Sequence, residues 1–232
     1  MIRKELIGSF WVKEPVDLTL IVLSRFGIVT KYKALDIFIH DALQDTTCDR
    51  GLDAVAPSLR FQELRAEDLP NLSLADGLMS CQEIYQRFAN GSRLFVALSG
   101  HTIVAHGWIN PRKASLGHIK RPEVVLPEGI GYLHGVVTAP AYRRLGIGTR
   151  LLHHRLMALR QEGYRAVVSA VYPANRLAAR WHIANGFWWW GRVRYLLWRG
   201  KDYWWNDMTA RGRRAASIVQ HSPFTFAESE SS

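Results

Sequence analysis

Cysteine and long apolar runs are the features that this 232-residue chain has least of. Its two cysteines, Cys48 and Cys81, do not lie at a spacing typical of metal ligands, and they fit a reducing compartment better than a disulfide framework. The apolar stretch 18–29 is interrupted by Ser24 and Arg25 and is too short to span a bilayer. We therefore expect a cytoplasmic protein with no metal site and at most a peripheral contact with membranes.

Acidic residues are scarce as well. The chain has 20 Asp+Glu against 30 Lys+Arg, which gives a formal net charge of +10 at pH 7. This excess favours an anionic partner, either a nucleotide cofactor, a nucleic acid or a membrane surface, and charge alone does not choose among them. The chain also lacks a P-loop lysine motif and a Gly-x-Ser-x-Gly elbow, so neither of these two sequence signatures points to its chemistry.

The most informative segment runs from Val136 to Leu152. A β-rich stretch ends before Pro140, a short loop rich in arginine and glycine follows, and a helical pattern of apolar residues then begins. Such a unit directs the backbone N–H groups of a helix N-terminus at one point, where the helix dipole attracts anions. Gly146 and Gly148 let the main chain approach a phosphate without an intervening Cβ. The segment predicts a pyrophosphate-binding site.

The rest of the pattern predicts one mixed domain over residues 58–208. We expect residues 1–57 to form an N-terminal extension packed on or preceding this domain, and residues 209–232 to form a basic, then Ser/Glu-rich flexible tail. Residues 110–129, which include three prolines, are expected to form a loop. Strands are predicted at 31–40, 61–64, 94–98, 102–109, 130–138, 165–171, 187–198 and 201–205, and helices at 79–89, 146–161 and 175–185.

This order of elements resembles the GNAT superfamily of acyl-CoA-dependent acyltransferases over residues 59–206. The segment Arg143-Arg144-Leu145-Gly146-Ile147-Gly148 matches the family's Q/R-x-x-G-x-G/A loop. The helix that begins after Asn175 and closes on Gly186-Phe187 matches the second family signature. The resemblance implies an α/β (α+β) fold with a mixed, mostly antiparallel sheet of about seven strands flanked by helices. It also implies a V-shaped splay between two parallel strands.

The resemblance further implies that acetyl-CoA, or another acyl-CoA, binds in this splay. The pyrophosphate would lie at the main-chain amides of residues 144–149, and the pantetheine arm between the strand that contains Val136 and the helix that begins after Asn175. The implied cofactor-binding residues are Val136, Val137, Thr138, Arg143, Arg144, Leu145, Gly146, Ile147, Gly148, Thr149 and Asn175.

The proton donor is the position at which the chain departs from the family pattern. A tyrosine that usually stands four residues before the glycine of Gly-Phe is taken to protonate the leaving thiolate, and here this position is His182. An imidazole can also donate a proton, and a thiolate with a pKa near 8.5 needs little help. Tyr172 and Tyr164 are alternatives, and an ordinary helix histidine is the simpler interpretation of His182.

A general base is needed to deprotonate the acceptor amine. His134 is our candidate, because strand alternation places it on the same face as Val136 and a neutral imidazole suits this task. A structural histidine in a half-buried strand is the alternative interpretation. Glu128 and Glu83 are rival bases, and ordered water could replace a single base.

Tryptophan and arginine are both concentrated near the C-terminal end of the predicted domain. Six of the nine tryptophans lie between residues 188 and 205, and we expect them mainly to pack within the sheet, with some share in an acceptor pocket. Arg192 and Arg194 share one strand face, which we expect to be solvated. We therefore do not expect a nucleic-acid partner.

The sequence thus predicts an N-acetyltransferase that moves an acetyl group from acetyl-CoA to the primary amine of a small molecule. An amino sugar, or a precursor of envelope or secondary metabolites, is the first expectation for the acceptor. A protein amino group is the alternative acceptor, and a non-catalytic acyl-CoA-binding module is the alternative function. We expect a monomer or a homodimer.

Overall fold

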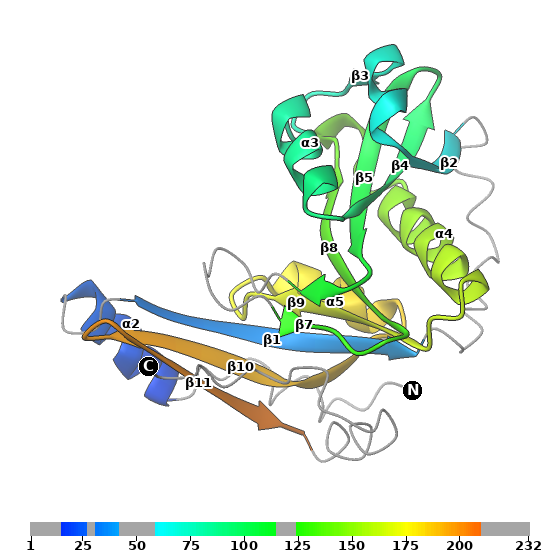
Figure 1. Ribbon diagram of the computed structural model, residues 1–232. Helices are drawn as coiled ribbons and strands as arrows, with labels where there is room; N and C mark the ends of the chain where they lie inside the picture. Colours follow the sequence, from blue (N-terminus) through cyan, green and yellow to red (C-terminus); the bar gives the residue numbers. More distant parts are fainter. Residues whose placement is uncertain (1–14, 27–30, 42–58, 115–123, 210–232) are drawn as a thin grey trace.

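A computed structural model describes residues 15–26, 31–41, 59–114 and 124–209 of the chain (Figure 1). The predictions that concern Cys48, most of the N-terminal extension and the tail after residue 209 lie outside the described residues. Within the described helices, none is long and apolar enough to cross a membrane.

A nine-stranded sheet forms the centre of the described structure. Its path runs β11-β10-β1-β9-β8-β5-β4-β2, and β3 pairs with β5. The strands are β1 (Lys31–Asp41), β2 (Leu59–Leu64), β3 (Ser73–Leu74), β4 (Arg93–Ser99), β5 (Thr102–Asn110), β8 (Ile130–Thr138), β9 (Ala166–Val171), β10 (Trp188–Trp198) and β11 (Lys201–Met208). All neighbouring pairs along this path are antiparallel except β8 and β9. The predicted fold class is confirmed.

Helices pack on both faces of the β4–β5 hairpin, because successive strand residues point to opposite faces. Leu94, Val96 and Leu98 form a core with α3 (Cys81–Ala89), whereas Phe95 and Ala97 form a core with α4 (Ile147–Gln161). The other helices are α2 (Pro15–Arg25), α5 (Arg176–Ala184) and the short 3₁₀ segments η1 (Ala66–Asn71) and η2 (Pro140–Tyr142). The described flanks of the expected 110–129 loop pair as a small hairpin of β6 (Lys113–Ala114) and β7 (Val124–Val125).

The parallel strands β8 and β9 separate soon after they meet. They pair only from Ile130 with Ala166 to Tyr132 with Val168, although β8 continues to Thr138. Beyond this point β8 follows β5, and Figure 1 shows it rising away from β9, β1 and β10. The sheet is therefore split, which is the V-shaped splay that the family resemblance implied.

The strand β1 lies between β9 and β10, so part of the expected N-terminal extension belongs to the sheet itself. Leu35, Ile37 and Ile39 pack in one core cluster, as their alternation predicts, while Phe38 packs in the cluster on the opposite face. The division expected between residues 57 and 58 does not separate β1 from the sheet. Strand pairing across more than a hundred residues leaves no local sequence signal that would have shown this.

The prediction of a solvated arginine face on β10 is wrong. Arg192 and Arg194 are 5% and 1% exposed. Arg192 forms a buried ion pair with Asp36 of β1, with Nε 2.8 Å from Oδ1, and Arg194 pairs with Asp207 of β11. A buried charge needs a partner of opposite sign, and the carboxylates of the neighbouring strands supply it.

Three of the four tryptophans of β10 pack in the sheet, as predicted, whereas Trp198 is 39% exposed. Trp188 and Trp190 contribute to one core cluster and Trp189 to the other, because they alternate along the strand. Trp190 is fully buried.

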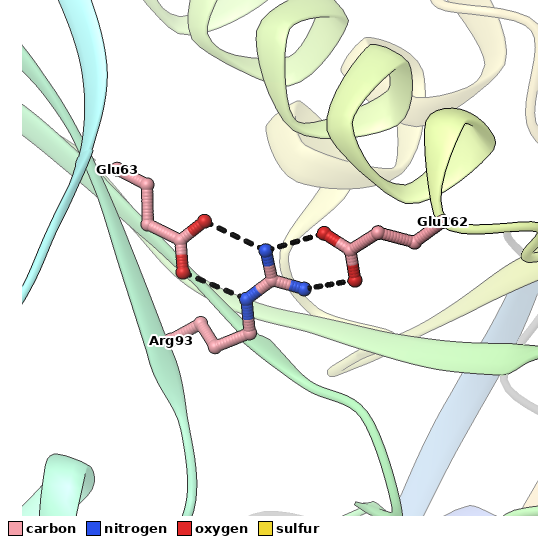
Figure 2. Close-up of polar contacts among 3 residues, drawn as sticks. All are labelled: Glu63, Arg93 and Glu162. Carbon is pink, nitrogen blue, oxygen red and sulfur yellow. Dashed lines mark hydrogen bonds and ion pairs between the residues drawn. The ribbon is translucent and has the colours of Figure 1, made fainter.

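One charged network ties the end of α4 to the sheet edge. Arg93 of β4 donates two hydrogen bonds to Glu63 of β2 and two to Glu162, the residue that follows α4 (Figure 2). The two carboxylates raise the pKa of Arg93. These four hydrogen bonds fix the C-terminal end of α4 against the edge of the sheet.

Candidate active site

The splay between β8 and β9 opens a cavity of about 1210 Å³. It is lined by residues of α3, β8, α4, β9 and α5, so residues from both sides of the divided sheet share one space. A ligand bound at the N-terminus of α4 could therefore extend through the cavity to a second ligand bound beside α3. Of the cavity-lining residues that the structure describes, none is an aspartate or a glutamate.

The mouth of the cavity is the N-terminus of α4. The Gly146 N-cap has a φ of +70°, and Arg144 has a φ of +65°, a conformation that costs a non-glycine residue of the order of 1 kcal/mol. No side chain caps this helix, and no acidic residue stands in its first turn. The first N–H groups of a helix need an acceptor, so this N-terminus is suited to an anionic group from a ligand.

Most of the predicted cofactor-binding residues line the cavity, and two of them do not. The lining residues are Val136, Thr138, Arg143, Arg144, Gly146, Ile147, Gly148, Thr149 and Asn175. Val137 and Leu145 are not among the residues that line it. Asn175 also accepts a hydrogen bond from the backbone N–H of Ala178, so its side-chain oxygen caps α5.

The hydrogen bonds of His182 leave it without a proton to donate to a ligand. Its Nδ1–H donates to the Ala178 carbonyl at 2.7 Å, and its Nε2 lies 3.0 Å from the Ser169 hydroxyl, which therefore donates to it. Burial lowers the pKa of His182 to about 4. A neutral imidazole bonded in this way has no free proton for a leaving thiolate. The geometry therefore favours the simpler interpretation, a structural histidine that lines the cavity.

The hydrogen bonds of His134 similarly occupy both ring nitrogens. Arg87 donates to Nδ1 at 3.2 Å, which leaves Nε2–H to donate to the Ser92 hydroxyl at 3.3 Å. Burial, then the charges of Arg87 and Arg155, lower the pKa of His134 to about 3. The residue lines the cavity, but its only basic lone pair is already paired with a cation.

The strand alternation used to place His134 is interrupted. Two residues of β8, Gly135 and Val136, lie opposite the single residue Gly107 of β5, which makes a β-bulge. Gly135 has a φ of +59°, a left-handed conformation that residues with a Cβ rarely adopt, so the bulge favours glycine at this position. His134 and Val136 both line the cavity, although simple alternation does not describe their relation.

The rival acids and bases occupy different places. Glu128 is exposed at the opposite end of β8 from the bulge, outside the cavity. Glu83 forms the capping box of α3 with Ser80 and does not line the cavity. Tyr164 does not line it either, whereas Tyr172 does and has a 41% exposed side chain.

Several cavity residues were not identified from the sequence, among them the polar residues Arg87, Arg155 and Ser169. Arg155 had a readable signal, because it stands four residues after Leu151 and four before Leu159, on the apolar face of α4. Arg87 and Ser169 had no such signal, since an arginine in a last helical turn and a serine in a strand are ordinary.

The family profile described as the Acetyltransferase (GNAT) family matches residues 59–187. The protein is therefore a member of the GNAT acetyltransferase family, a class of acyltransferases that use an acyl-CoA as cosubstrate. A comparison with curated proteins finds no match.

Among the similar solved structures, one with a TM-score above 0.5 supports the same fold. A glucosamine N-acetyltransferase region of a fungal multi-domain GH3 β-N-acetylglucosaminidase superposes with a TM-score of 0.52 at 15% identity, over 79% of this chain and 23% of that one. A GNAT family protein from Novosphingobium aromaticivorans gives 0.48 at 16% identity, over 72% and 65%. An aminoglycoside 6′-N-acetyltransferase from Acinetobacter haemolyticus gives 0.41 at 22% identity, over 56% and 90%. At these identities the likeness concerns the fold alone.

Proposed function

We propose that this protein transfers an acetyl group from acetyl-CoA to the primary amine of a small molecule. The observation that carries the proposal is the uncapped N-terminus of α4 at the mouth of a cavity that enters the β8–β9 splay. A phosphate group at this N-terminus would leave the rest of the same molecule directed between the two strands.

The residues at the mouth fit coenzyme A. Arg144, Gly146, Ile147, Gly148 and Thr149 line the cavity at the N-terminus of α4, and Arg143 and Arg144 add positive charge at its wall. A Cβ on Gly148 would meet only the Thr138 hydroxyl, at 3.8 Å, so the space in front of the first turn is open. When bound, coenzyme A supplies the acyl group as a thioester, which is activated toward attack by an amine.

The chain's own residues supply the surroundings for this attack. The bulge of β8 exposes backbone next to the reacting end of the cavity, where an N–H group can polarise a thioester carbonyl. Tyr172 replaces His182 as our proposed proton donor, because its side chain lines the cavity and is accessible. We infer that water deprotonates the acceptor, since no described carboxylate lines the cavity and the lone pair of His134 is occupied.

The charge of the cavity limits the acceptor. Arg87, Arg143, Arg144 and Arg155 line it, and none of the described lining residues is a carboxylate. A polycationic acceptor would be repelled by this surface, whereas a neutral or anionic molecule with one amine would not. An acetylatable amino sugar with one amine, or a related metabolite precursor, therefore stays our first acceptor class.

A turnover assay tests this function. Purified protein is incubated with acetyl-CoA and single amines from a panel of amino sugars, amino acids and polyamines, and free thiol release is followed together with the mass of each product. The proposal predicts thiol release that depends on one class of amine and an acetylated product. Tight binding of acetyl-CoA without turnover on any amine would instead favour a non-catalytic acyl-CoA-binding module, and acetylated peptides would favour a protein acceptor.

A further inference from the structure

Arg155 is a fully buried cation in the wall of the cavity. It is 0% exposed, and its Nη1 donates a hydrogen bond to the Trp108 carbonyl at 3.3 Å. Its Nε and Nη2 donate no hydrogen bond to any residue that the structure describes. Buried guanidinium groups are costly unless carboxylates and hydrogen bonds compensate them, so this group requires an explanation.

No described carboxylate compensates this charge. Burial lowers the pKa of Arg155 to about 9, and no acidic side chain acts against this shift. The side chain is therefore still protonated near pH 7. By contrast, Arg192 and Arg194, the buried arginines of β10, each have an aspartate partner. Arg192 and Arg194 are therefore ion-paired, whereas Arg155 has no described carboxylate partner.

The surroundings of Arg155 make room for the charge. A Cβ on Gly107 of β5 would lie 2.8 Å from both Cζ and Nη1 of Arg155, so the guanidinium packs directly on a glycine. Gly107 is also the residue opposite the β8 bulge, so the cation lies next to the bulged backbone. Arg155 lines the same cavity as His134 on β8 and His182 on α5, one residue from each wall of the splay.

A second cation lies near Arg155, on the opposite face of β5. Trp108, which follows Gly107 in the strand, packs in the core on the α3 side, and its Nε1 donates no hydrogen bond to any residue that the structure describes. Arg87 lies 5.4 Å from the ring centroid of Trp108 and also lines the cavity. A second cation and one unpaired N–H donor therefore lie beside this part of β5, and both favour an anion.

We propose that Arg155 forms a carboxylate-binding subsite inside the cavity, and that one of the two substrates carries this carboxylate. Arg155 stands eight residues after Ile147, which is roughly 12 Å along the axis of α4 from the phosphate end of the cavity. The subsite thus binds a group at the reacting end of a substrate, separate from the phosphates. The inference rests on the proposed function and specifies its substrate class. The carboxylate can belong to the acyl chain or to the acceptor.

The first experiment tests the acyl chain as the source. Calorimetry measures the affinity of the wild type and of Arg155→Met for acetyl-CoA, butyryl-CoA and succinyl-CoA, the last two of which differ mainly in the terminal carboxylate. If the acyl chain is the source, the wild type binds succinyl-CoA about 10- to 100-fold more tightly than butyryl-CoA. Arg155→Met removes this preference.

The second experiment tests the acceptor as the source. Acetyl transfer is compared between amino acids and their carboxamides, which have the same shape without the charge. If the acceptor is the source, kcat/KM for the acids exceeds that for the amides by about 10- to 100-fold in the wild type and not in Arg155→Met. Arg155→Lys keeps part of the preference, because it retains the charge without the planar fork.

A stability measurement separates a substrate-binding role from a structural one. Methionine in place of an uncompensated buried arginine is expected to leave the free energy of unfolding unchanged or higher. A clear loss of stability in Arg155→Met would show that the arginine supports the fold, and it would overturn the proposal. A wild type without either carboxylate preference, or an Arg155→Met variant that keeps the preference of the wild type, would also overturn it. Absence of coenzyme A binding would instead reject the proposed function.

Discussion

A carboxylate placed in the first turn of α4 should stabilise the protein and abolish coenzyme A binding. Gly148 faces the space where the pyrophosphate is proposed to lie, and the protein itself leaves room for a Cβ there. Asp in this turn interacts favourably with the helix dipole, so Gly148→Asp should raise the free energy of unfolding by about 0.3–1 kcal/mol. The variant is therefore expected to fold.

The expected loss of binding follows from charge repulsion. Two unit charges about 5 Å apart repel by about 3 kcal/mol at an effective dielectric constant of about 20, which corresponds to more than 100-fold in affinity. Gly148→Ala is the matched control, since it adds the Cβ without the charge and meets only Thr138 at 3.8 Å. Calorimetry with coenzyme A and thermal unfolding measure the two effects. If Gly148→Asp were as stable as expected and bound coenzyme A normally, the assignment of this helix N-terminus would be refuted.

Three further predictions concern the histidines and the ion pairs. In the folded protein the pKa values of His134 and His182 are about 3 and about 4, below the ordinary value of 6.5. At any pH between the folded-state pKa and 6.5, the unfolded chain therefore binds more protons than the folded protein. Stability should therefore fall as the pH drops from 7 to 5, by about 1–2 kcal/mol for each histidine, and a flat denaturation free energy would contradict their burial. Arg93→Met should lower the free energy of unfolding by about 1 kcal/mol, because the two ion pairs of Arg93 are partly exposed. Arg93→Lys should lower it by almost as much, since lysine cannot bond both carboxylates in the same way. An unchanged free energy of unfolding in both variants would show that these ion pairs do not stabilise the fold. Asp36→Ala should cost about 3 kcal/mol or more in chemical denaturation, since it removes the buried partner of Arg192, and a neutral effect would mean that β1 adds little to the sheet.

The sequence revealed the parts of the site that depend on local structure. The β8–loop–α4 unit, the Asn175 cap and the close of α5 at Gly186 follow from residues near one another in the chain, and the structure confirms these elements. Their spacing also led to the correct family. Local patterns of this kind depend on turn chemistry and helix periodicity, which the sequence carries directly.

The parts that could not be predicted depend on distant contacts. Asp36 and Arg192 are 156 residues apart, so neither the position of β1 nor the burial of the arginine was visible in the sequence. The role of His182 changed for a similar reason, because Ser169 on β9 supplies the proton that its Nε2 accepts. Arg155 was the exception, since an arginine within an apolar helical face is a signal that the sequence did contain.

The structure of a complex with acetyl-CoA tests the proposed site most directly. The pyrophosphate oxygens are expected within hydrogen-bond distance of the backbone amides of residues 144–149, and the thioester between β8 and β9 beside the bulge at Gly135 and Val136. Acetyl-CoA bound at another surface, or with its phosphates away from the N-terminus of α4, would show that the cavity in the splay is not its binding site.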